Sequence, residues 1–209
     1  MKKLTAILLA TSLCLFSGAT MAKAKAKEFY QDIYAVVDVG KAAISGDFCD
    51  RSPAGVGCVM NITSTAWRAG LGYQFNENYG VELQYVNAYK LNLNASSSTE
   101  TVTVEGSFTG YEASVVGVTP LTTSFAFLGK VGVALLAGKS SLTSTVTGTK
   151  TGSADNTAFA FGLGMRYKAS KNIAIRLMYE NYGDVKFGSS ATSISTPLSI
   201  ISAGLQVGF

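Results

Sequence analysis

The sequence predicts an all-β protein, an eight-stranded antiparallel up-and-down β-barrel whose strands span a membrane. From residue 29 onward, large apolar side chains alternate with small or polar ones at the two-residue period of a strand. Eight segments show this pattern, and the connections between them are alternately short and long. Hydrophobic residues make up 47% of the chain, yet beyond residue 22 there is no run of about 18 uncharged apolar residues that a transmembrane helix would need.

The first 22 residues have the composition of a cleaved export signal. Lys2 and Lys3 form a positive start, residues 4–16 form an apolar stretch too short to span a bilayer, and small residues follow up to Ala22. We therefore expect a signal peptide at residues 1–22 and a single barrel domain at residues 23–209.

The exact cleavage position has alternatives after Ala24 and Ala26, within an Ala-Lys repeat. A lipoprotein signal would use Cys14, but Leu13 stands where such signals need a small residue. Removal of the signal takes away two lysines and lowers the net charge from +4 to +2. That charge offers no basic surface for nucleic acid, so we expect no nucleic-acid partner.

Cys49 and Cys58 are the cysteines that remain after the signal is removed. An even pair in an exported chain predicts a disulfide, with two unrelated free thiols as the alternative. The bridge would close a loop of about ten residues and would shape that loop rather than hold the fold.

The predicted strands cover about residues 32–42, 65–75, 79–91, 107–119, 124–137, 157–168, 172–182 and 197–209. Short connections at 76–78, 120–123 and 168–172 have the composition of tight turns. Long connections at 43–64, 92–106, 138–156 and 183–196 are predicted as loops, although some keep a strand-like alternation. This alternation of lengths places the tight turns at one end, as in an up-and-down barrel and unlike a Greek-key sandwich.

The two faces of each strand differ in a way that distinguishes two kinds of barrel. In segment 157–168 the odd positions include Phe159, Phe161 and Leu163, whereas the even positions include Ala158 and Gly162. A soluble lipocalin-like barrel would need an outer face dense in Lys, Glu and Thr. A face of Gly and Ala with one charge per strand suits the narrow interior of a membrane barrel, whose apolar face meets lipid.

Aromatic residues gather near the strand ends, as in the interfacial girdles of membrane barrels, although ordinary core packing is the alternative for each one taken singly. These residues are Tyr73, Phe75, Tyr79, Phe125, Phe127, Tyr167 and Tyr179.

The charges on the small face fix which face points inward. Turned toward lipid, each Arg or Lys near the midplane would cost about 2–4 kcal/mol. We therefore expect four acids and four bases to pair in the lumen and to close it. These predicted luminal residues are Asp38, Arg68, Glu82, Glu112, Lys130, Arg166, Arg176 and Glu180.

Three stretches resemble a known family. Residues 72–85 (GYQFNENYGVELQY) and residues 162–167 with 173–180 (GLGMRY, IAIRLMYE) are similar to the OmpA-like and OmpX-like small outer-membrane β-barrels. The final SAGLQVGF, residues 202–209, resembles their C-terminal assembly signal. Within that family the chain looks like the compact surface-antigen members, without a peptidoglycan-binding domain after Phe209.

The resemblance implies a Gram-negative outer membrane, with lipid and lipopolysaccharide around the barrel. It also implies that the assembly machinery reads Ser202, Gly204, Val207 and Phe209. Glu82 and Arg176 match luminal residues of the family's ion-pair network. The family has a luminal Glu where this chain carries Arg166, so we expect a different pairing scheme here.

Three function classes remain open. The first is a non-enzymatic surface protein whose long loops bind a host or envelope ligand, or which is purely structural. The second is a small low-conductance pore, although eight strands leave an interior that side chains fill. The third is an enzyme, which the chain's zero histidines disfavour because barrels that cut lipid or peptide use histidine-assisted chemistry. We expect no enzymatic activity and no cofactor.

Overall fold

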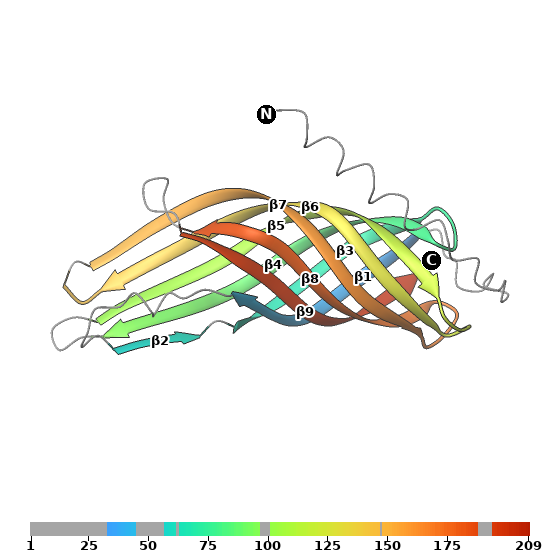
Figure 1. Ribbon diagram of the computed structural model, residues 1–209, viewed down its shortest axis with the longest axis horizontal. Coiled ribbons are helices and arrows are strands. Elements are labelled where there is room, and N and C mark those ends of the chain that lie inside the picture. The colour runs from blue at the N-terminus through green and yellow to red at the C-terminus, as the bar shows by residue number, and fades with distance from the viewer. Residues whose placement is uncertain (1–32, 45–56, 62, 97–100, 147, 188–193) are drawn as a thin grey trace, which may run out of the picture.

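The computed structural model describes residues 33–44, 57–61, 63–96, 101–146, 148–187 and 194–209, which form a closed antiparallel β-barrel (Figure 1). This confirms the predicted fold class. The signal at 1–22 and Cys49 lie outside the described residues, and so does the side chain of Cys58. Among the described residues, the structure has no helix of the length and apolarity required to pass through a membrane.

Eight long strands form the wall and a short one extends it. The strands are β1 Ile33–Ile44, β2 Gly57–Asn61, β3 Thr63–Gln74, β4 Tyr79–Ser96, β5 Thr101–Pro120, β6 Phe125–Ser144, β7 Gly148–Lys168, β8 Ile173–Phe187 and β9 Ile194–Gly208. β1 pairs with both β3 and β9, and the other long strands pair with their neighbours along the chain, so the ring closes. The short β2 continues the line of β3 along β4.

Three four-residue turns close one end of the barrel, which we call the turn end. In each, the first turn residue donates its N–H to the first carbonyl of the next strand, as from Phe75 to Tyr79 at 2.9 Å and from Leu121 to Phe125 at 2.9 Å. Side chains hold these turns, because Asn76 Oδ1 accepts hydrogen bonds from the N–H groups of Asn78 and Tyr79. The predicted short connections are thus confirmed.

The outward face of the wall is an apolar belt bounded by aromatic residues. On β6, outward side chains run from Phe125 to Leu135, which at about 3.3 Å per residue and a tilt of about 40° spans roughly 25 Å, the height of a bilayer's apolar core. We call the end of the barrel opposite the turns the upper end. Trp67, Tyr85 and Tyr111 form a chain of ring contacts at the upper margin of the belt, with neighbouring ring centroids 5.4 and 5.5 Å apart. Above that margin the outward residues are polar, with Lys41, Thr65, Thr109 and Asp155 at exposed or half-buried positions.

The inward face differs from the prediction because it also carries large apolar side chains. Toward the turn end, small and charged residues are accompanied by a buried apolar cluster of Val116, Val118, Ala126, Leu128 and Met178. Farther from the turns, a second buried cluster combines the expected small alanines with large apolar side chains that were not predicted. This upper core contains Ala42, Ala66, Val86, Ala88, Phe108, Ala134, Leu136, Ala158, Ala160, Tyr182, Val185, Leu198 and Ile200, all buried.

The strands opposite the turn end are longer than predicted. Residues 92–106 and 138–156 were expected to be loops, but β4 and β5 pair up to Ser96 and Thr101, and β6 and β7 pair up to Ser144 and Gly148. Figure 1 shows β4 to β7 extending past the ends of β1 and β9 at the left of the view. The prediction of loops there was wrong because paired Ser, Thr and Gly backbones form strands without needing an apolar face. In the other two connections, β2 occupies part of 43–64, and β8 and β9 occupy part of 183–196.

Candidate functional site

A closed ring of ion pairs crosses the lumen at the middle of the barrel. Three carboxylates alternate with three cations, in the order Asp38, Arg68, Glu180, Lys130, Glu82, Arg176 and back to Asp38. The six residues come from five strands and each is 3% exposed or less. Ion pairs in a low-dielectric interior interact strongly, so the ring links opposite walls of the barrel.

Arg176 joins two acids of the ring. Its guanidinium donates to both carboxylate oxygens of Asp38, at 2.7 and 2.5 Å, which is a bidentate geometry. It also donates to Glu82 Oε1 at 2.8 Å. Glu82 also accepts hydrogen bonds from the hydroxyl of Tyr34 at 3.0 Å and from Gln84 Nε2 at 3.1 Å, so both acids keep several donors in place of water.

Lys130 is the second junction of the network. Its ammonium lies 2.8 Å from Glu112 Oε1, 2.7 Å from Glu180 Oε1 and 3.6 Å from Glu82 Oε2. It also donates to Gln84 Oε1 at 2.9 Å. Glu112 therefore attaches to the ring through Lys130, and its other oxygen accepts from the hydroxyl of Tyr182, in the upper core, at 2.8 Å.

Arg166 lies apart from the ring. It stands opposite Arg176 in the pairing of β7 with β8 and donates to Gln206 Oε1 at 3.4 Å. Seven of the eight predicted luminal residues thus meet in one network, and the eighth is buried near it. Sequence reasoning missed the neutral partners Tyr34, Gln84, Tyr182 and Ser202, which have the same inward parity as the charges; Ser202 Oγ accepts from Arg68 at 2.7 Å.

A glycine makes room for the ring at Gly204. A Cβ at this position would overlap the Asp38 carboxylate and approach the carbonyl of Val37 at 2.5 Å. The absence of a side chain on β9 therefore lets Asp38 lie against the wall, where it can face both Arg68 and Arg176.

The C-terminal residues of the predicted assembly signal lie on both faces of the barrel. Ser202 and Gly204 face the lumen, whereas Val207 and Phe209 face outward. The N–H of Phe209 donates to the carbonyl of Ile33 at 3.0 Å and thereby closes the seam between β1 and β9. Recognition of these residues by assembly machinery stays a prediction.

The luminal acids are paired with cations. Within the described residues, no group of three or more Cys, His, Asp or Glu side chains is arranged to hold a metal ion. Each acid of the ring is held by cations, and the upper core covers the ring on the side away from the turns. Both layers lie across the bore.

The second notable region is a sheet that stands above the belt. Its strands lie in the order β2, β4, β5, β6 and β7. β7 pairs with β6 along its whole length, but in the described part of the chain it pairs with β8 only from Phe161 to Lys168. The stretch Gly148–Ala160 therefore has a backbone edge without a described strand partner.

One side chain marks the point at which β7 and β8 separate. The Asn156 amide donates to the carbonyl of Lys186 at 3.0 Å and accepts from its N–H at 2.7 Å, so it imitates a pair of ladder hydrogen bonds. Beyond Asn156 the edge of β7 consists of residues 148–155, with the sequence GTKTGSAD. We call these residues the β7 edge.

The chain matches a known family of proteins. A model of the outer membrane protein beta-barrel domain matches residues 10–209. No curated protein matches the chain.

Two solved structures share the fold of this chain, and a third aligns with it over most of its length. The attachment invasion locus protein Ail of Yersinia pestis aligns with 16% identity over 85% of this chain and 99% of that chain, with a TM-score of 0.51. Neisserial surface protein A aligns with 16% identity over 85% and 97%, with a TM-score of 0.56. The outer membrane protease OmpT of Escherichia coli aligns with 10% identity over 85% and 97%, with a TM-score of 0.44.

Proposed function

Because the chain belongs to the outer membrane protein β-barrel family, we propose that it is a non-enzymatic surface protein whose projecting sheet binds a protein ligand by strand addition. As an outer membrane protein of Gram-negative bacteria, it has its short turns on the periplasmic side and its longer connections outside, as is usual for such barrels. The sheet of β2, β4, β5, β6 and β7 then stands outside the cell.

The observation that supports this proposal is the β7 edge. An unpaired strand edge presents a row of backbone N–H and C=O groups that an extended peptide can join. Side chains that usually protect such edges are few here, since the edge contains one lysine, Lys150, and no proline. Ail is named for attachment and invasion, and its likeness to this chain supports the fold alone.

The test shortens one hairpin and compares it with another. Deleting residues 140–152 would let the β6–β7 hairpin close at the pair Gly138 and Ala154, with Lys139 and Ser153 as a two-residue turn, which removes most of the β7 edge without changing the register below. The control deletes residues 93–104, so that the β4–β5 hairpin closes at Leu91 and Gly106 with Asn92 and Glu105 as the turn. Both variants keep the belt and the lumen.

Binding of cells that display each variant to immobilised serum and extracellular-matrix proteins is the measurement. We expect the first deletion to abolish binding and the second to leave it. Equal loss in both variants, or binding that survives the first deletion, would contradict strand addition at this edge. No binding by the unaltered protein would favour a purely structural role.

The proposal excludes catalysis on chemical grounds. The sequence has no histidine, and the buried acids are engaged by cations rather than facing a cleft. Incubation of the refolded barrel with phospholipid, lipid A or peptide should give no turnover, and turnover of any of these would overturn this part of the proposal.

A further inference from the structure

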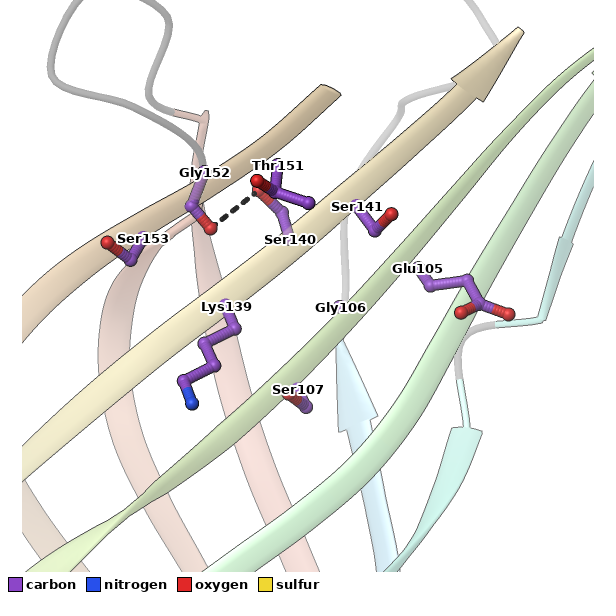
Figure 2. Close-up of a pocket in the computed structure, with 9 residues that line it drawn as sticks. All are labelled: Glu105, Gly106, Ser107, Lys139, Ser140, Ser141, Thr151, Gly152 and Ser153. Carbon is purple, nitrogen blue, oxygen red and sulfur yellow. Dashed lines mark hydrogen bonds between the residues drawn. The ribbon is translucent and has the colours of Figure 1, made fainter. Parts of the chain in front are cut away.

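Two hollows adjoin on the outer surface of β5, β6 and β7 where the belt ends. The lower hollow, about 470 Å³, is lined by the apolar belt residues Tyr85, Tyr111 and Leu135 and reaches up to Ala137 and Asp155. The upper hollow, about 440 Å³, has a polar lining that includes Glu105, Lys139 and Ser153 (Figure 2).

Strand register places the two hollows end to end on the same outward face, and we call them together the groove. Tyr111 is opposite Leu135, and the next outward row consists of Thr109, Ala137 and Asp155. The row above consists of Ser107, Lys139 and Ser153, and then come Glu105, Ser141 and Thr151. Ala137 is the small outward residue at the join between the hollows, and the backbones of Gly106, Gly110 and Gly152 also line them. The groove therefore passes from lipid-facing aromatics to charged and hydroxyl groups over a few rows.

The charged groups of the groove have no partners among the described residues. No ion pair within 4.0 Å or side-chain hydrogen bond joins Lys139, Glu105 or Asp155 to any described residue. Figure 2 shows the Lys139 ammonium and the Glu105 carboxylate apart, on either side of the upper hollow. A cation flanked by two acids and several hydroxyls can hold a ligand that offers both an anion and many hydroxyl donors.

We propose that this groove binds the headgroup of a phosphorylated glycolipid of the outer leaflet. An acyl chain lies along Tyr111 and Leu135, at the depth where such chains end. Lys139, with Ser107 and Ser153 on either side, holds the phosphate. Asp155 and Glu105 accept hydrogen bonds from sugar hydroxyls, which explains why acids stand beside the site of an anionic lipid. This inference uses the outward face of the sheet, so it does not depend on the β7 edge.

Binding can be measured by native mass spectrometry of the full barrel in mild detergent with three lipids. Lipid A supplies phosphate and sugar, phosphatidic acid supplies phosphate alone, and a glucosyl diacylglycerol supplies sugar alone. We expect lipid A to bind at least about tenfold more tightly than either of the others, since each lacks one set of charge-assisted hydrogen bonds.

Two variants probe the two parts of the groove. Lys139→Gln should reduce lipid A binding about tenfold, to the level of the glucosyl lipid, because the phosphate loses its cation. Ala137→Leu should weaken all three lipids by filling the join between the hollows. Lys171→Gln, at the turn end, and Ala203→Leu, an outward position on β9, are the matched controls and should bind as the parent does.

Folding of every variant is checked by its heat-dependent shift in gel migration. Phosphatidic acid binding as tightly as lipid A would show a general anionic-lipid surface and overturn the proposal. Unchanged lipid A binding by Lys139→Gln or by Ala137→Leu would also overturn it. Failure of the hairpin experiment would leave this result unaffected, so the two proposals are tested separately.

Discussion

At the scale of the residue, the interior depends on a few side chains that each serve several partners. Lys130 contacts carboxylates from three other strands, and Arg176 holds acids from two. A buried ion pair adds an uncertain net stability, but removal of one partner leaves the others as uncompensated buried charges. Removal of a cation should therefore lower the free energy of unfolding more when that cation pairs with more acids.

Lys130→Met tests this directly. The substitution leaves Glu82, Glu112 and Glu180 without their shared cation, and we expect it to lower the free energy of unfolding by about 3–5 kcal/mol. Urea unfolding of the barrel in lipid vesicles measures the change. Lys171→Met, in a turn outside the belt, is the control and should change stability by less than about 0.5 kcal/mol. Equal stabilities for the two variants would show that the network does not support the barrel.

Each luminal charge could be predicted from the sequence. A charged side chain on the small face of a strand must point into the lumen, because the other face of the strand meets lipid. The partners of these charges were not predictable, because which cation reaches which acid depends on the stagger between strands. The upper core was also missed. Leu135 with Leu136, and Ile200 with Ile201, are adjacent apolar pairs at which one residue faces lipid and the next faces inward. Such pairs are the sequence signal that both faces have become apolar.

At the scale of the element, β7 changes surroundings along its length while keeping its alternation. From Phe159 to Tyr167 its outward residues are large and apolar, and from Thr149 to Thr157 they are polar. The lower part pairs on both sides, whereas the upper part pairs with β6 alone in the described chain. The predicted strand, 157–168, covers only the part of β7 that faces lipid. The sequence pattern detects a strand where apolar residues on one face alternate with small or polar residues on the other. The remainder is held by backbone hydrogen bonds, which leave little trace in the residue types.

One substitution at two positions of β7 separates these environments. Leu163→Arg places a cation on the middle of the belt and should cost about 2–4 kcal/mol of unfolding free energy. Thr149→Arg places the same cation on the same face of β7 but above the belt, and it should lower the free energy of unfolding by at most about 1 kcal/mol. Vesicle unfolding measures both. If the two costs were equal, the lipid boundary drawn along β7 would be wrong.

At the scale of the whole molecule, the barrel is closed along its axis. The ion-pair ring lies across the middle, and the upper core, including Phe108, Leu136 and Ile200, lies between the ring and the outside. Water and ions would have to displace both layers in order to pass. This interior favours an anchor for an external sheet over a channel.

Conductance measurements check this consequence. The refolded protein in a planar bilayer should give no steady ion current, because both layers lie across the bore. A channel protein of known conductance, incorporated in the same way, controls for insertion. A reproducible steady current would show that the interior opens and would restore the pore as the better account.

The orientation of the wall is the central claim, and site-directed spin labelling tests it most directly. Labels at Leu205 and Gln206, neighbours on β9 with opposite faces, are placed in a cysteine-free chain reconstituted into vesicles. Collision with oxygen, which concentrates in lipid, is compared with collision with a water-soluble nickel complex. The structure predicts a label at Leu205 open to oxygen and closed to nickel, and a label at Gln206 shielded from both. A label at Leu205 that nickel reaches freely would contradict the membrane barrel described here.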